Sequence, residues 1–200
     1  MIRRIVDIAV SGLLLGFASP VLAAAAVAIR LESPGPAIYR QRRIGRGGRP
    51  FEVLKLRTMV QGAEGIGAGL AVNEDDPRIT RVGALLRRTS LDELPNLLNV
   101  LRGEMSLIGP RPTLPGQVAS YTPRQRGRLA IRPGITGWAQ VNGRASLPWS
   151  ERIELDLHYI EHRSLALDLR ILWRTLAIVL GGAGLYKGET GGGGEVGTDG

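Results

Sequence analysis

One segment near the N-terminus restricts the possible folds of this chain more than any other feature. Residues 8–29 carry no charged side chain, and these 22 residues are enough to cross a bilayer as a helix. Three interpretations fit the segment: a cleaved signal peptide, a spanning helix, and a helix that breaks at Ser19 and Pro20 and returns to the side it entered from. Proline removes a backbone hydrogen bond and kinks a helix, and the Ser19 hydroxyl can satisfy the freed carbonyl.

Basic residues flank this segment on both sides. Arg3 and Arg4 precede it. The arginines that follow it are Arg30, Arg40, Arg42, Arg43, Arg46 and Arg49. Basic flanks stay on the cytoplasmic side of a membrane, which a re-entrant hairpin allows and a spanning helix does not. The flanks therefore favour the hairpin, and the signal peptide and the span stay open as alternatives.

Charge and cysteine content narrow the classes of partner. The 26 basic and 18 acidic residues give a net charge of +8, which suits an anionic membrane surface, phosphorylated substrates or nucleic acid. Nucleic-acid binding rests on this charge alone, because the chain has only two Phe, three Trp and four Tyr residues and no known binding module. We therefore expect no nucleic-acid partner. The absence of cysteine excludes a disulfide scaffold, a cysteine zinc site and a cysteine nucleophile.

The pattern beyond the N-terminal segment predicts a small α/β domain with a few short strands and several amphipathic helices. Residues 37–41 and 51–56 read as two strands joined by a turn rich in Gly and Arg. Helices are expected at residues 90–101, 117–129, 149–163 and 165–180. The last of these has a wide apolar face, which suits a membrane surface as well as a protein core. The glycine-rich segment 61–71 is expected to form a loop.

The sequence Ser90-Leu91-Asp92-Glu93-Leu94-Pro95 allows two interpretations. Ser90 with Glu93 three residues later matches a capping box, which starts a helix without any catalysis. The neighbouring arginines favour a second interpretation, because guanidinium groups match phosphate oxygens. These arginines are Arg87 and, in Gly/Pro-rich turns, Arg111, Arg132 and Arg144. Two carboxylates among them suit a site that binds a divalent cation and a diphosphate.

Such a site can carry out group transfer. A carboxylate can attack phosphorus and form an acyl-phosphate intermediate. Nearby arginines would hold its pKa low and keep the anion available. An adjacent carboxylate can hold Mg²⁺, which bridges phosphates and neutralises developing charge.

A second motif, His158-Tyr159-Ile160-Glu161-His162, matches the H-x-x-E-H zinc-protease pattern. Those enzymes need a further protein ligand downstream. The only later glutamates, Glu189 and Glu195, lie in a glycine-rich tail. We therefore regard the match as a chance occurrence.

Taken together, the motifs resemble the bacterial sugar transferases, the monotopic polyprenyl phosphate phosphoglycosyl transferases, in their short catalytic-core form. The resemblance covers about residues 1 to 180. The segments that carry it are Ser19-Pro20, Pro34-Gly35-Pro36, Lys55-Leu56-Arg57-Thr58-Met59, Ser90-Leu91-Asp92-Glu93-Leu94-Pro95-Asn96, Gly109-Pro110-Arg111-Pro112 and Arg132-Pro133-Gly134-Ile135-Thr136-Gly137-Trp138-Ala139-Gln140-Val141-Asn142-Gly143-Arg144.

This resemblance implies an organisation and a location. It implies an N-terminal re-entrant membrane hairpin at residues 1–31, whose break matches Ser19 and Pro20, and a sugar transferase domain at residues 32–180. The protein would be monotopic in the inner membrane, in contact with membrane lipids, with its active site at the cytoplasmic face. The glycine-rich tail at residues 181–200 lies outside the shared pattern and is expected to be disordered.

The resemblance also implies a reaction. Asp92 would attack the sugar-bearing phosphate of a UDP-sugar and expel UMP, and undecaprenyl phosphate would then take the phosphosugar. Glu93 would bind Mg²⁺ with Asp92, whereas Arg87, Arg111, Arg132 and Arg144 would bind phosphate or substrate. The competing interpretations are a membrane-attached basic anion-binding protein without catalysis and a nucleotide-sugar hydrolase. The sugar, the glycan pathway and the oligomeric state stay open, a homodimer included.

Overall fold

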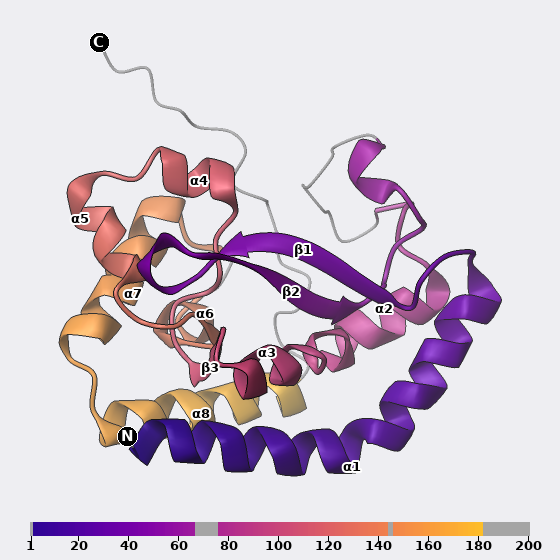
Figure 1. The fold of residues 1–200 in the computed structure, drawn as a ribbon, viewed down its shortest axis with the longest axis horizontal. Helices are drawn as coiled ribbons and strands as arrows, with labels where there is room; N and C mark the ends of the chain where they lie inside the picture. The colour runs from indigo at the N-terminus through magenta and orange to yellow at the C-terminus, as the bar shows by residue number, and fades with distance from the viewer. Residues whose placement is uncertain (1, 67–75, 144–145, 182–200) are drawn as a thin grey trace.

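Helix α1 (Ile2–Glu32) holds the whole uncharged segment, in a computed structural model that describes residues 2–66, 76–143 and 146–181. Figure 1 shows α1 as one helix with a bend, which first runs beside α8 (Leu165–Gly181) and then turns toward α2 (Arg81–Arg88). Pro20 lies inside α1 and cannot donate to the carbonyl of Gly16. The Ser19 hydroxyl donates to that carbonyl instead, at 2.8 Å, as the sequence predicts. The expected break is therefore a bend within a continuous helix.

The first turns of α1 are fixed to the rest of the chain by polar contacts. Arg4 donates to the carbonyls of Val100 and Leu101 at 2.6 and 3.0 Å, and so satisfies the C-terminal end of another helix. Asp7 is buried, and its carboxylate accepts from the Ser106 hydroxyl at 2.8 Å and from the Leu107 amide at 3.0 Å. This end of α1 is thereby joined to elements about 100 residues away in sequence.

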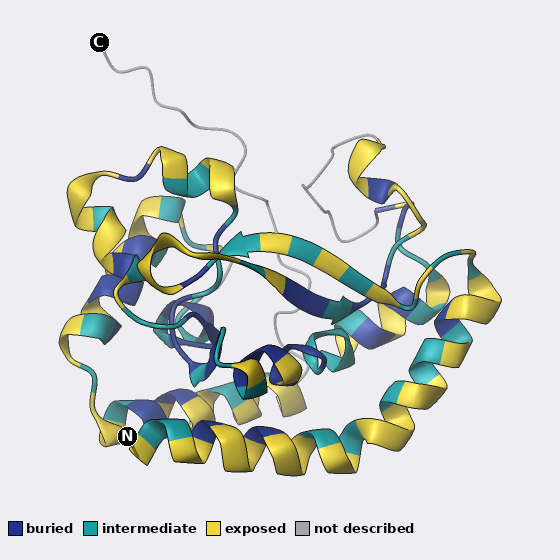
Figure 2. Cartoon of the chain, in the orientation of Figure 1, coloured by how far each residue is buried: buried dark blue, intermediate teal, exposed yellow. Residues whose placement is uncertain are grey.

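The other end of α1 attaches to the same domain. Arg57 is buried and donates to the carbonyls of Ser33, at 2.8 Å, and Pro34. Glu32 accepts from the amides of Arg81 and Val82 at 2.8 and 3.0 Å, which caps the start of α2. The middle of α1 is left open (Figure 2): only 6% of the residues in its most apolar stretch are buried, and the helix is long and apolar enough to cross a membrane.

In the described residues, four short strands frame the rest of the domain. Strands β1 (Ile38–Ile44) and β2 (Pro50–Leu56) pair antiparallel, with Ile38 opposite Leu56, which confirms the expected hairpin. Strands β3 (Ser106–Ile108) and β4 (Gly134–Thr136) pair in parallel and were not expected, because three residues are too few to show alternation. The mixed α/β domain is therefore confirmed.

Two of the four expected helices are confirmed and two are interrupted. Helices α7 (Trp149–Glu161) and α8 agree with the expectation. The expected helix at 90–101 is a 3₁₀ turn, η3 (Leu91–Glu93), followed by the short helix α3 (Asn96–Arg102). The expected helix at 117–129 is wrong because Pro123 starts a new helix with Thr122 as its cap. This part of the chain instead forms three short elements, α4 (Pro115–Ala119), α5 (Pro123–Arg126) and η4 (Gly127–Leu129). The remaining short helices are η1 (Arg46–Gly48), η2 (Ala63–Gly65) and α6 (Trp138–Val141).

Small apolar clusters, rather than one large core, hold these elements together. The cluster of Val53, Val100 and Met105 joins β2 to α3 and to the chain before β3. Figure 2 shows the buried residues gathered where these elements meet, between α1 below and the β1–β2 hairpin above. The η3 turn joins this region at the start of α3. The tail at residues 182–200 and segment 67–75 lie outside the described residues.

Candidate active site

The Asp-Glu pair lies on a turn with an unusual backbone. Ser90, just before it, has φ +56° and is the only non-glycine residue with positive φ in the described part of the chain. This conformation costs about 1–2 kcal/mol for a residue with a side chain. The capping-box interpretation is wrong, because the Ser90 side chain makes no capping hydrogen bond and the Glu93 side chain contacts cations instead. The turn holds Asp92 and Glu93 half-buried beside the domain interior.

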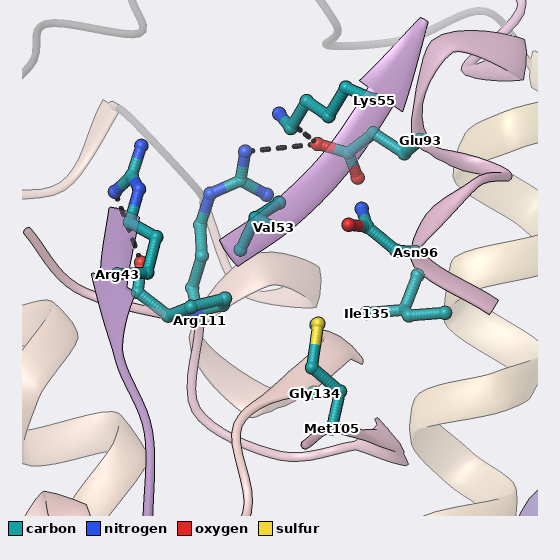
Figure 3. Close-up of a pocket in the computed structure, with 10 residues that line it drawn as sticks. Arg43, Val53, Lys55, Glu93, Asn96, Met105, Arg111, Gly134 and Ile135 are labelled. Atoms are coloured by element: carbon teal, nitrogen blue, oxygen red, sulfur yellow. Dashed lines mark hydrogen bonds and ion pairs between the residues drawn. The ribbon is translucent and has the colours of Figure 1, made fainter. Parts of the chain in front are cut away.

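Glu93 is paired with two cations. Lys55 Nζ from β2 donates to Glu93 Oε1 at 2.9 Å, and Arg111 Nη2 donates to the same oxygen at 3.0 Å (Figure 3). Burial raises the pKa of Glu93, but the charges of Lys55 and Arg111 outweigh burial and hold that pKa well below its usual range. Glu93 is therefore an anion at any physiological pH.

These side chains line a pocket that opens to solvent. Figure 3 shows Lys55, Glu93 and Arg111 on one side of it and Met105 below them. The lining residues are Arg43, Val53, Lys55, Glu93, Asn96, Met105, Arg111, Pro112, Gly134 and Ile135. Three of them are cationic and one is anionic, so the lining carries a net charge of +2 and favours an anionic ligand.

The backbone that carries Arg111 is held from beneath by a buried network. Arg128 donates to the carbonyl of Arg111 at 3.2 Å and to the hydroxyls of Thr113 and Tyr121, each at 2.7 Å. Its charge is balanced by Asp156 at 2.6 Å, and the side chains of this ion pair are only 3% and 1% exposed. Because prolines flank Arg111 and Arg128 holds its carbonyl, the guanidinium group projects into the pocket from a rigid base.

The structure brings together some of the predicted site residues. Glu93 and Arg111 line the pocket. Asp92 precedes Glu93 in the η3 turn. Arg87 lies in the last turn of α2 and donates from Nε to the Thr58 hydroxyl at 2.8 Å. Arg132 donates to the carbonyl of Gly103 at 2.7 Å and does not line the pocket. Arg144 lies outside the described residues.

Three polar residues of the pocket have no role in the sequence-based prediction. Lys55 belongs to a motif that carries the family resemblance, but a lysine in a strand gives no sign of its partner. Arg43 comes from β1 and donates to the carbonyl of Pro112 at 3.1 Å. Asn96 follows Glu93 by three residues, and the expected continuous helix gave no reason to place Asn96 in a pocket. Only the packing of the β1–β2 hairpin against the η3 turn and the segment around Pro112 reveals these residues.

The side chains at this site suit Mg²⁺ in combination with phosphate oxygens. The described residues contain no group of three His, Cys, Asp or Glu side chains that could hold a metal alone. Asp92 and Glu93 supply two neighbouring carboxylates, and Mg²⁺ typically uses one or two carboxylates and completes its shell with water and substrate phosphates. The same observation disfavours the zinc interpretation of His158 and His162, whose rings stack 4.2 Å apart.

Comparison with known proteins identifies the class of protein that this fold and site represent. The family model described as bacterial sugar transferase matches residues 1–182. The chain belongs to the bacterial sugar transferase family, which confirms the resemblance.

Several curated relatives are similar over most of this chain. A UDP-glucose:undecaprenyl-phosphate glucose-1-phosphate transferase from Caulobacter vibrioides is 47% identical, over 89% of this chain and 69% of the relative. The uncharacterized sugar transferase EpsL from Bacillus subtilis is 40% identical, over 94% and 91%. A UDP-N-acetylgalactosamine-undecaprenyl-phosphate N-acetylgalactosaminephosphotransferase from Aeromonas hydrophila is 43% identical, over 92% of this chain and 44% of the relative. These names support the class of UDP-sugar:undecaprenyl-phosphate sugar-phosphate transferases, and they differ in the sugar.

Proposed function

We propose that this protein transfers a sugar-1-phosphate from a UDP-sugar to undecaprenyl phosphate, giving undecaprenyl-diphosphate-sugar and UMP. The observation that carries the proposal is the Asp92-Glu93 turn, which adjoins a pocket with a net charge of +2. Such a pocket attracts a diphosphate, and the turn places the Glu93 carboxylate in its lining with Asp92 as the preceding residue. The names of the relatives support the same substrates. The product would serve polysaccharide or glycoconjugate biosynthesis.

In the proposed reaction, the phosphosugar group is transferred twice, first to Asp92 and then to the lipid phosphate. A carboxylate oxygen of Asp92 forms a bond to the phosphorus that carries the sugar, while the bond from that phosphorus to the UMP oxygen breaks and UMP leaves. A phosphate oxygen of the lipid then attacks the same phosphorus and releases Asp92. Lys55 and Arg111 would hold the diphosphate, since both are cations that line the pocket beside Glu93. Mg²⁺ held by Glu93 and Asp92 would neutralise phosphate charge when bound.

Nucleotide release tests this function most directly. Detergent-purified full chain with Mg²⁺ would be incubated with a panel of UDP-sugars, with and without undecaprenyl phosphate. We expect UMP from one donor, in an amount that depends on the lipid. UMP that forms continuously without lipid would indicate a hydrolase. If the protein is folded and membrane-bound and binds phosphate polymers but releases no UMP from any donor, the result would favour the alternative of an anion-binding protein without catalysis.

We further propose that α1 enters the inner membrane from the cytoplasmic side and returns, as a monotopic anchor. The support is that Arg4 and Asp7 at one end, and Glu32 at the other, bind the same domain. A straight span would separate these two ends. The exposed apolar side chains of α8 beside α1 add to the surface available to membrane lipids (Figure 1).

The topology can be mapped with single cysteines, because the chain has none of its own. Ile2→Cys and Leu31→Cys replace residues that are 70% and 83% exposed. Neither cysteine should react with a membrane-impermeant maleimide added outside intact cells, and both should react after the cells are opened. Labelling of one position from outside would contradict the re-entrant hairpin and favour a span.

A further inference from the structure

One buried polar atom in the pocket has no hydrogen-bond partner. Asn96 is the first residue of α3 and is 3% exposed, and its Oδ1 makes no hydrogen bond. Figure 3 shows the amide on the pocket wall below Glu93, with its oxygen directed into the pocket. A buried acceptor without a donor is costly, so native proteins rarely keep one without a further role. The position of this oxygen in the pocket points to a bound ligand.

The neighbouring Asn99 shows what a structural asparagine looks like in the same helix. Asn99 Oδ1 accepts from the amide of Leu54 at 3.1 Å. Its Nδ2 donates to the carbonyl of Glu52 at 2.6 Å and to the Glu104 carboxylate at 2.7 Å. Asn99 thus joins α3 to β2 with both its amide oxygen and its amide nitrogen hydrogen-bonded. No such set of contacts accounts for Asn96.

The charges of the pocket restrict the ligand that Asn96 can bind. An amide oxygen requires a hydrogen-bond donor or a cation. A free divalent cation is disfavoured here, because Arg43, Lys55 and Arg111 leave the lining with a net charge of +2. A cation that carries a diphosphate meets both conditions, since the diphosphate satisfies the arginines and lysine.

The oxygens available for such a cation are of the right kind. Lys55 and Arg111 both donate to Oε1 of Glu93, so the second oxygen, Oε2, lies outside this pair of contacts. Carboxylate and amide oxygens are hard ligands of the kind that Mg²⁺ and Mn²⁺ accept. Figure 3 shows Asn96 on the side of Glu93 opposite Lys55.

We propose that the Asn96 carboxamide oxygen is a ligand of the divalent cation beside Glu93, and that this cation is held together with the diphosphate of a nucleotide. The inference rests on the proposed function, because that function supplies a nucleotide diphosphate as substrate. Asn96 then determines the affinity for the cation, whereas Lys55 and Arg111 determine the affinity for the diphosphate.

Mn²⁺ is the probe for this site, because its electron paramagnetic resonance signal falls when it binds protein. The full chain in detergent is titrated with Mn²⁺ with and without UDP, after subtraction of the binding of Mn²⁺ to UDP alone. We expect UDP to tighten Mn²⁺ binding, and Asn96→Leu to weaken the UDP-dependent binding by roughly tenfold or more. Asn96→Asp should tighten it, because the added charge attracts the cation. Met105→Leu is the matched control, which alters the same pocket without removing an oxygen, and should bind Mn²⁺ like wild type.

Unchanged Mn²⁺ affinity in Asn96→Leu would overturn the inference, as would equal affinity with and without UDP. An equal loss in Met105→Leu would also overturn it, because the effect would then come from packing. If Asn96→Leu fails to fold, Asn96→Asp decides, and unchanged affinity in that variant refutes the role of Asn96. The assay requires no turnover. UDP-dependent Mn²⁺ binding that is lost in Asn96→Leu, in a protein that releases no UMP from any donor, would therefore sustain this inference while the proposed function fails.

Discussion

Asp92→Asn is expected to lower UMP release by roughly 10³-fold or more, because an amide cannot take the place of the attacking carboxylate. Asparagine matches aspartate in size, so the η3 turn and the thermal unfolding temperature should be retained. Glu93→Gln is the matched control: it removes the adjacent carboxylate and should shift the Mg²⁺ dependence while leaving measurable turnover.

Intact-protein mass spectrometry can test the intermediate itself. Wild-type protein given the correct UDP-sugar without lipid should gain the mass of one phosphosugar and release one equivalent of UMP. Asp92→Asn should show neither change. Substantial turnover by Asp92→Asn, or a phosphosugar attached to another residue, would refute Asp92 as the nucleophile.

Arg128→Met is expected to reduce the free energy of unfolding by about 3–5 kcal/mol, because it leaves the Asp156 carboxylate buried without its cation. The double variant Arg128→Met/Asp156→Leu removes both charges and should recover a large part of this loss. Denaturant unfolding of the full chain in detergent measures both values.

Arg124 provides a matched control for this pair. Arg124 and Glu154 lie 2.7 Å apart, but their side chains are 63% and 54% exposed. Arg124→Met should therefore cost far less stability than Arg128→Met, because solvent screens an exposed ion pair. A loss in Arg128→Met no greater than that in Arg124→Met would contradict the role of the buried network beneath Arg111.

The sequence predicts well those features that local pattern determines. The apolar segment, the Ser19 contact that relieves Pro20, the β1–β2 hairpin and helices α7 and α8 all follow from composition and periodicity. Asp92 and Glu93 are also visible in the sequence, because a motif of the family contains both residues. These features depend on residues within a few positions of one another.

The remainder depends on contacts between distant segments. Ser90 matches a helix cap in sequence, yet it has positive φ and precedes a turn whose Glu93 is paired with Lys55 of β2. Arg132 and Arg111 both stand in Gly/Pro-rich turns with the same apparent chemistry. Arg132 satisfies the carbonyl of Gly103 after the end of α3, however, whereas Arg111 reaches Glu93. Residue type alone cannot separate these outcomes.

The attachment of α1 at both ends has a consequence for biogenesis. The N-terminal turns leave the ribosome first, yet their partners, such as Ser106 and Asp168, are about 100 and 165 residues further along the chain. With the membrane topology proposed above, α1 would reach the bilayer before the domain that it completes has been synthesised. A variant without α1 would expose the surfaces that Arg4 and Asp7 satisfy. Deleting α1 should thus yield an insoluble fragment rather than a soluble enzyme, because α1 is an integral part of the packing of the domain rather than a detachable tether.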